Sequence, residues 1–341
     1  MSRTSPNSFE PLLLSRPEGL YCPAGDFYID PSKPVKNAVI THGHGDHASS
    51  GSENYFCLQE GESILRRRLI ANSKITPFEK GTSFTLGDVA ISFHPAGHIL
   101  GSSQIRMETS KTVWVMSGDY KRDPDPTCEA FEPVECDVFI TEATFGLPIY
   151  RWEPTSEIAR QIFEWWENNK RLGKTSILFC YALGKAQRVL AELMAYTQQG
   201  VLTHGAVEGI VEVYRKEKIP MLPTRKVSET DPKSDYAGEL VIAPPSSYGS
   251  PWLRRFKNND TAFASGWMRI RGNRRRKGYD RGFVLSDHAD WPSLLKTVEE
   301  TKAKHVYVTH GSIDILVPYL NERGISSSAL ATDFKLEDDT E

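Results

Sequence analysis

Thr41-His42-Gly43-His44-Gly45-Asp46-His47 governs the interpretation of this chain, because it brings three imidazoles and a carboxylate together within seven residues. It follows Ala38-Val39-Ile40, an apolar run typical of a β-strand. Alternate side chains of an extended chain share a face, so the first two histidines can point at one ion. The glycines let the backbone turn the aspartate and the last histidine toward a second ion. The loop therefore predicts a centre for two metals, and a solvated histidine-rich turn is the alternative.

A second group of possible ligands lies downstream, again at the ends of apolar runs. His98 follows Pro95-Ala96-Gly97, Asp119 ends a run that starts at Val113, and His310 ends a run that starts at His305. Ligand sites of layered α/β folds gather where strands end. If Asp119 bridges, each ion has four protein ligands: His42, His44, His98 and Asp119 for one, and Asp46, His47, Asp119 and His310 for the other. These donors suit Zn²⁺ and can accept Mn²⁺, so we expect two Zn²⁺ ions as cofactors.

The ligand segments resemble the metal motifs of the metallo-β-lactamase superfamily, in their usual order along the chain. Further segments are similar to motifs of its β-CASP nuclease branch: Thr141–Gly146 to motif A, Ser286–Asp290 to motif B and His310 to motif C. The run Tyr181–Gln187 resembles the first helix entry of the β-CASP insertion. The whole chain, and above all Phe263–Trp291, looks like the bacterial ligase-associated DNA exonucleases, a group also described as mRNA 3′-end processing factors.

This resemblance implies an α/β fold, in which a metallo-β-lactamase αββα sandwich carries a small inserted α/β cap domain of the β-CASP type. Apolar runs up to Phe145 indicate strands with ligands at their ends, and the middle of the chain alternates strands with helical periodicity, as βαβ units do. We expect Thr155 to cap a helix and Pro292 to begin the terminal one. The expected sandwich comprises residues 17–146 and 282–333, the cap 147–281, and the loose termini 1–16 and 334–341.

Composition favours a soluble enzyme. The 341 residues are 39% hydrophobic with a mean hydropathy of -0.42, and no run approaches the ~18 apolar residues of a membrane span. The first ten residues are polar and lack the pattern of a signal peptide. Five scattered cysteines without a Cys-x-x-Cys pair indicate reduced thiols. These features predict a cytoplasmic protein without a membrane partner.

The net charge of -3 hides a strongly basic segment. Lys277, Arg281 and five further arginines fall within thirteen residues, a density that can follow a phosphodiester backbone. A solvated basic loop is the alternative. Lys185 stands at a predicted helix start that could bind phosphate or simply pack, and Trp267 could stack on a base or lie in the core. The substrate-binding candidates are Arg269, Arg271, Arg274, Arg275, Arg276, Lys185 and Trp267.

The ligand set predicts hydrolysis of a phosphodiester. Two Zn²⁺ ions about 3.5–4 Å apart lower the pKa of a shared water toward about 7 and stabilise charge on phosphorus. The leaving oxygen needs a proton, and the imidazolium of His288 could donate it. The resemblance implies His288, Glu142 and Asp46 as catalytic residues, with Glu142 hydrogen-bonded to the His288 ring. Asp30 has two interpretations, a residue that steadies the metal loop or a turn former before proline.

Three functions remain open. The first is a two-metal DNA exonuclease that acts on single-stranded ends in repair, for which the resemblance implies a DNA ligase and a helicase as partners. The second is an RNA 3′-end processing or decay nuclease with the same mechanism, since histidine at motif C is typical of RNA enzymes of the group. The third is a small-molecule hydrolase of thioesters or lactones, which would explain the metals but not the cap, Glu142, His288 or the basic segment.

Overall fold

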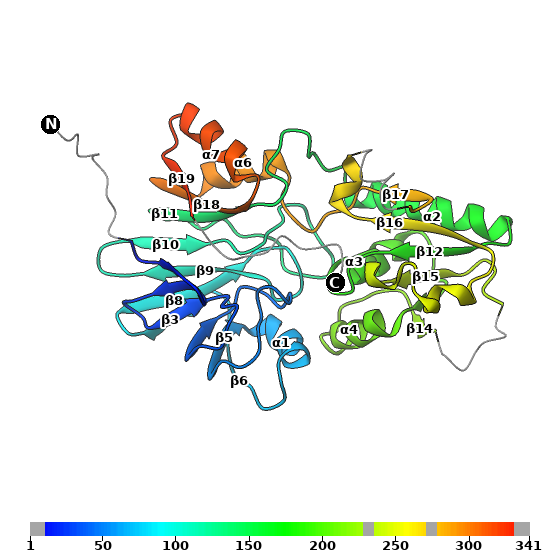
Figure 1. Cartoon of the computed structure of the whole chain (residues 1–341), viewed down its shortest axis with the longest axis horizontal. Coiled ribbons are helices and arrows are strands. Elements are labelled where there is room, and N and C mark those ends of the chain that lie inside the picture. Colours follow the sequence, from blue (N-terminus) through cyan, green and yellow to red (C-terminus); the bar gives the residue numbers. More distant parts are fainter. Residues whose placement is uncertain (1–10, 228–234, 271–277, 331–341) are drawn as a thin grey trace.

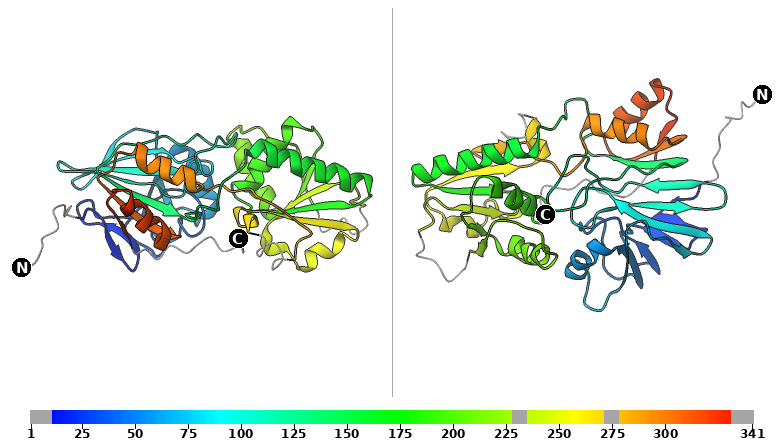
Figure 2. Two further views of the ribbon diagram at one scale, coloured as in Figure 1. Left: turned by 90° about the horizontal axis from the view of Figure 1, so that it is seen from above. Right: turned by 180° about the vertical axis from the view of Figure 1, so that it is seen from behind.

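The computed structural model describes residues 11–227, 235–270 and 278–330, and shows a mixed α/β protein built on three sheets (Figure 1). The α/β class is therefore as expected. The elements separate into two bodies (Figures 1 and 2). The two-sheet body holds the first two sheets with α1, α6 and α7, and the third-sheet body holds the remaining sheet with α2, α3 and α4.

Two sheets pack face to face in the two-sheet body. The first has the order β1-β2-β3-β4-β5-β6 and the second β19-β18-β11-β10-β9-β8-β7. Phe27 and Val39 of the first sheet share one core with Phe93 and Trp114 of the second. The strands are β1 (Leu14–Arg16), β2 (Gly19–Cys22), β3 (Phe27–Ile29), β4 (Asn37–Val39), β5 (Asn54–Leu58), β6 (Lys74–Phe78), β7 (Phe84–Leu86), β8 (Val89–Pro95), β9 (Ser103–Glu108), β10 (Val113–Met116), β11 (Val138–Ala143), β18 (His305–Gly311) and β19 (Ser327–Ala329).

Helices cover the outer faces of both sheets. Leu65 of α1 (Glu62–Arg68) packs against Tyr55 of the first sheet. The outer face of the second sheet is covered by α6 (Trp291–Glu300) and α7 (Ile313–Glu322), whose apolar side chains pack on β11 and β18. Asp290 caps α6 by accepting a hydrogen bond from the Ser293 amide, so this helix begins one residue before Pro292.

The third sheet is parallel throughout and has the order β14-β13-β15-β12-β16-β17. All five residues of its central strand are buried, as a strand covered on both faces requires. The strands are β12 (Thr175–Phe179), β13 (Val201–Thr203), β14 (Thr224–Lys226), β15 (Leu240–Ala243), β16 (Asn259–Ala264) and β17 (Arg281–Phe283). Helices α2 (Thr155–Arg171), α3 (Lys185–Glu192) and α4 (Gly205–Lys216) pack on one face. The 3-10 helices are η1 (Gln59–Gly61), η2 (Leu193–Ala195), η3 (Pro245–Ser247), η4 (Pro251–Arg255) and η5 (Gly266–Arg269).

The structure differs from the sequence expectation at three places. Leu12 and Leu13 are buried and β1 pairs with β2, so the chain is ordered well before residue 17. Strand β17 pairs with β16 and Phe283 packs in the core of the third sheet, so the chain leaves that sheet after residue 282 and not before it. Thr155 is the first residue of α2 and not its cap. Residues 1–10 and 331–341 lie outside the described parts of the chain. Within the described parts, no helix is long and apolar enough to cross a membrane.

Candidate metal centre

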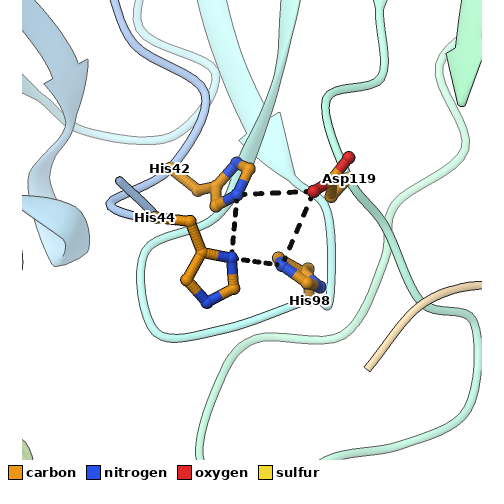
Figure 3. Close-up of side chains that lie close together, drawn as sticks. All are labelled: His42, His44, His98 and Asp119. Atoms are coloured by element: carbon orange, nitrogen blue, oxygen red, sulfur yellow. Dashed lines mark hydrogen bonds and ion pairs between the residues drawn. The ribbon is translucent and has the colours of Figure 1, made fainter. Parts of the chain in front are cut away.

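Four predicted ligands of the first ion converge at the ends of strands in the two-sheet body. His42 and His44 follow β4, while His98 follows β8 and Asp119 follows β10. All are buried, and one ligand atom from each lies within 4.8 Å of the others (Figure 3). The Nδ1 atom of His44 is 3.2 Å from His42 Nε2 and 3.1 Å from His98 Nε2. The Oδ2 atom of Asp119 is 3.6 Å from His42 Nε2 and 4.0 Å from His98 Nε2.

These distances fit a divalent cation. Ligands at about 2.0–2.1 Å from a tetrahedral zinc lie about 3.3–3.4 Å from one another, and the observed separations bracket that value. The tautomers agree with this. His98 Nδ1 faces the carbonyl of Asp287 at 2.9 Å and His44 Nε2 faces the carbonyl of Leu183 at 3.3 Å, so in the neutral rings both are donors. The facing nitrogens then carry lone pairs, which repel each other unless a cation binds both.

The second set of predicted ligands meets the first at Asp119. His47 Nε2 lies 3.5 Å from Asp119 Oδ2 and 3.6 Å from Asp46 Oδ2, while His310 Nε2 lies 3.3 Å from Asp119 Oδ1. Asp119 thus presents one oxygen to the His42 side and the other to His310. The buried Oδ1 of Asp46 has no hydrogen-bond partner among the described residues. A buried carboxylate oxygen needs a partner, and a second cation would provide it.

Asp30 orients the metal loop, which decides between its two interpretations. Its Oδ2 lies 2.8 Å from His47 Nδ1 and accepts a hydrogen bond from the Thr41 hydroxyl at 2.5 Å, and its Oδ1 accepts one from the Thr41 amide at 2.8 Å. Burial alone would lower the pKa of His47, but Asp46, Asp119 and Asp30 together raise this pKa to about 10. A metal ion would therefore displace a proton from this ring when it binds.

Two threonine hydroxyls hold the rings of His42 and His310 in the same way. Thr41 donates to Asp30, so its oxygen can accept from His42 Nδ1 at 3.0 Å. Thr309 donates to the carbonyl of Thr141, so its oxygen can accept from His310 Nδ1, also at 3.0 Å. Each relay places a proton on Nδ1 and turns the Nε2 lone pair toward Asp119. Neither threonine was singled out from the sequence.

The backbone conformation of Gly118 places Asp119 in the candidate metal centre. Gly118 has φ +58°, and a Cβ there would lie 2.8 Å from Thr41 Cβ. Only glycine combines this conformation with so close an approach to the metal loop. Burial would raise the pKa of Asp119, but the positive charge of His47 and those of further histidines hold this pKa well below its usual range. The carboxylate is therefore ionised, as a ligand must be.

The predicted acid and its partner lie beside the ligands. His288 Nδ1 is 2.9 Å from Glu142 Oε2 and 3.1 Å from Oε1, and the amide of Tyr120 donates to Oε1 at 2.8 Å. Ligand-type atoms of Asp119, Glu142 and His288 all lie within 4.8 Å of one another, and the His288 ring centroid is 4.7 Å from that of His98. Because Glu142 engages Nδ1, the proton that His288 could donate to a substrate is the one on Nε2.

The substrate-binding candidates predicted from the sequence differ in their exposure and in their contacts. Trp267 is partly buried, and its ring centroid lies 4.8 Å from that of Phe145. The ring centroid of Phe145 lies 5.9 Å from that of His288. Arg269 is exposed, and its Nε donates to the carbonyl of Ile149 at 3.3 Å. Lys185 agrees with the packing alternative and not with the phosphate contact, because its side chain is 3% exposed and pairs with Asp287 at 3.2 Å. Predicted phosphate contacts at Arg271, Arg274, Arg275 and Arg276 lie outside the described residues.

Sequence comparisons agree with this geometry. A protein named probable DNA ligase from Opitutus terrae is 31% identical over 322 residues, which are 94% of this chain and 31% of that protein. The endoribonuclease YSH1 of Gibberella zeae is 29% identical over 36% of this chain and 15% of its own length. An RNase J-like protein of Methanocaldococcus jannaschii is 29% identical over 34% of this chain and 28% of its own length.

The chain belongs to the β-CASP family of the metallo-β-lactamase superfamily. The relatives confirm the resemblance carried by the motifs, although no protein-family model matches the chain. This β-CASP protein spans only about a third or less of the length of these relatives. A solved structure of an Enterococcus faecalis V583 protein of unknown function shares the fold, with a TM-score of 0.57 and 13% identity over 86% of this chain and 78% of the other.

Proposed function

We propose that this protein is a two-metal phosphodiesterase that cleaves single-stranded nucleic acid, with DNA ends as the substrate. One observation carries the proposal: the shared carboxylate Asp119 lies within 4.8 Å of the His288–Glu142 pair. The site therefore combines a place for metal ions with a positioned proton donor. The first supports attack on phosphorus, and the second supports departure of the sugar oxygen.

The metal ions, when bound, would lower the pKa of water and stabilise negative charge on the phosphate. The chain's own residues do the rest. Glu142 orients the His288 ring through Nδ1, and its own carboxylate is fixed by the Tyr120 amide. His288 then protonates the leaving oxygen through Nε2, which general acid catalysis makes worth about 10²–10⁴-fold in rate.

The two bodies correspond, in this proposal, to an αββα sandwich and an inserted cap. The helix-sheet-sheet-helix layering of the two-sheet body supports the first assignment. The parallel third sheet, which is inserted between β11 and α6 in the chain, supports the second. Strand β17 belongs to the cap, so we extend the proposed cap to Leu285, which packs in the same core.

The choice of DNA rests on a relative that matches 94% of the chain and is named probable DNA ligase. RNA is the second candidate, because other relatives are named endoribonuclease and RNase J-like. A DNA ligase and a helicase remain proposed partners. Two Zn²⁺ ions are the proposed cofactors, and Mn²⁺ would suit the same nitrogen and oxygen donors.

The deciding experiment supplies the purified protein, loaded with Zn²⁺ or Mn²⁺, with end-labelled single-stranded DNA and with RNA of the same sequence. We expect a ladder of DNA products that starts at one end, whose label also gives the polarity. Faster cleavage of RNA would replace DNA by RNA in the proposal. Failure to cleave either polymer, together with hydrolysis of a thioester or lactone, would overturn it in favour of a small-molecule hydrolase.

A further inference from the structure

A cluster of buried charges joins helix α3 of the third-sheet body to the segment Ser286–His288. Lys185 Nζ lies 3.2 Å from Asp287 Oδ2, and Arg188 Nη1 lies 3.5 Å from Asp287 Oδ1. None of the three side chains is more than 3% exposed. Taking so many charges out of water is costly, so a buried ion pair is weak evidence for stability, and a role in fixing local geometry is the hypothesis to test.

Arg188 and a third cation, Lys121, also hold the backbone of this segment. The carbonyl of Ser286 accepts hydrogen bonds from Arg188 Nη1 at 3.0 Å and from Lys121 Nζ at 2.9 Å. Arg188 is fixed in turn by Asp125, 3.3 Å from its Nε, and by the hydroxyl of Thr155. The segment is thus held through its backbone and its side chain at once.

What this segment supports is the reaction site itself. The carbonyl of Asp287 faces Nδ1 of the predicted ligand His98 at 2.9 Å, and the next residue, His288, pairs with Glu142. On the other side of the cluster, the carbonyl of Leu183, two residues before Lys185, faces Nε2 of His44 at 3.3 Å. One ionic cluster therefore stands behind two metal ligands and the proton donor.

The contact between the bodies is tight at this point. Gly184 has φ +88°, and a Cβ there would lie 2.3 Å from Cγ2 of Ile99, the residue after His98. The Nε atom of Arg188 also lies 3.3 Å from the carboxylate of Asp125, which belongs to the two-sheet body. The backbone before α3 therefore lies in close contact with the residue that follows His98.

We propose that Lys185 and Arg188 are positioning residues, which fix the Ser286–His288 segment and thereby orient His98 toward the metal and His288 toward the leaving group. The inference deepens the proposed function and rests on it for its kinetic part. Of the two alternatives that the sequence left for Lys185, it sets aside binding to the phosphates of the substrate. The two roles predict different kinetics, because a phosphate contact acts on substrate binding whereas positioning acts on the metal and on turnover.

The test compares the wild type with Lys185→Met and Lys185→Arg, and uses Lys170→Met as matched control. Lys170 lies on α2 of the same body, where it is exposed and pairs with Glu167. Metal affinity is measured by competition with a chromogenic chelator. The kcat and KM values are measured on single-stranded DNA and on bis(p-nitrophenyl) phosphate, whose leaving group needs no acid.

For Lys185→Met we expect metal affinity to weaken about 10- to 100-fold, as when the residue behind a ligand is lost, and kcat on DNA to fall by a similar factor. The KM should stay within about 2-fold, the loss on the activated ester should be smaller than on DNA, and Lys185→Arg should restore much of both values. The control should match the wild type. A raised KM with unchanged kcat and unchanged metal affinity would overturn the inference and restore the phosphate contact.

Two further outcomes keep the inference falsifiable. If Lys185→Met does not fold, the charge-neutral pair Lys185→Met with Asp287→Asn replaces it, and wild-type metal affinity in that protein would overturn the inference. If the wild type cleaves neither DNA nor RNA, the proposed function fails by itself. The metal affinities of the variants, which need no turnover, would then still decide whether these residues position the site.

Discussion

The metal loop His42–His47 and the segment Ser286–His288 build adjacent parts of one site by opposite means. The loop carries four predicted ligands in sequence, and its orienting residue Asp30 is only 11 residues from Thr41. The segment depends on distant parts of the chain, since the pair of His288 with Glu142 spans 146 residues and the contact of Asp287 with His98 spans 189. The comparison teaches that the candidate ligands of the loop are specified locally, whereas the candidate proton donor is placed by the tertiary structure.

The largest effect should come from replacing Asp119, the residue that the two sets of candidate ligands share. Asp119→Ala removes the carboxylate between the two sets of ligands, so we expect cleavage to fall by at least about 10³-fold, equivalent to several kcal/mol of lost transition-state stabilisation. Metal content by elemental analysis should fall as well. The exposed Asp88→Ala serves as control. Normal turnover of a metal-replete Asp119→Ala enzyme would disprove the bridging role.

Replacing the proposed proton donor should lower the rate without loss of metal, which distinguishes its role from that of the metal loop. We expect His288→Ala to keep its metal but to lose about 10²–10⁴-fold in the rate on DNA, because the leaving oxygen loses its acid. The loss should be much smaller on a nitrophenyl ester. His305→Ala, which changes a histidine bonded to Ser326 and Ser328, is the control. Equal losses on both substrates would contradict the role of general acid.

The local support of the loop gives a smaller effect. In Asp30→Asn the amide can still accept from Thr41, but its NH₂ group would face the protonated Nδ1 of His47, so the ring should turn away. We expect metal affinity to weaken about 10- to 100-fold, measured by chelator competition. Asp26→Asn is a matched control, since Asp26 also has positive φ but is exposed and pairs with Lys36. Unchanged affinity would show that the loop needs no such support.

The smallest effect concerns substrate binding by the basic arginines, which belong neither to the metal loop nor to the segment Ser286–His288. Replacing Arg274, Arg275 and Arg276 by alanine should weaken binding of single-stranded DNA and reduce the slope of log affinity against log salt by about 2, if all three contact phosphates. Metal content and the rate on nitrophenyl esters should not change. Alanine at Arg160, Arg171 and Arg323, exposed on α2 and after α7, is the control. An unchanged salt slope would exclude this segment as the phosphate track.

Much of the fold and of the metal set could be predicted, because the signals are local. The alternation of strands and helices and the ligands at strand ends follow from hydrophobic periodicity, which needs only neighbouring residues. The expectations that were wrong concern packing at the edges. Leu12 and Leu13 are buried by the sheet that β1 joins, and Phe283 is buried by pairing with β16. Short edge strands carry little periodicity, so their partners decide them.

The sequence by itself determined the seven candidate ligands, the α/β class and the family, since residue type and spacing are sufficient for each. Only the tertiary structure decided that Asp30 supports the loop, that Thr41 and Thr309 set the ring tautomers, and that Lys185 pairs with Asp287. The physical reason is that a ligand is recognised by its chemistry. A supporting hydrogen bond or buried ion pair exists only once distant segments meet, and any polar side chain could provide it.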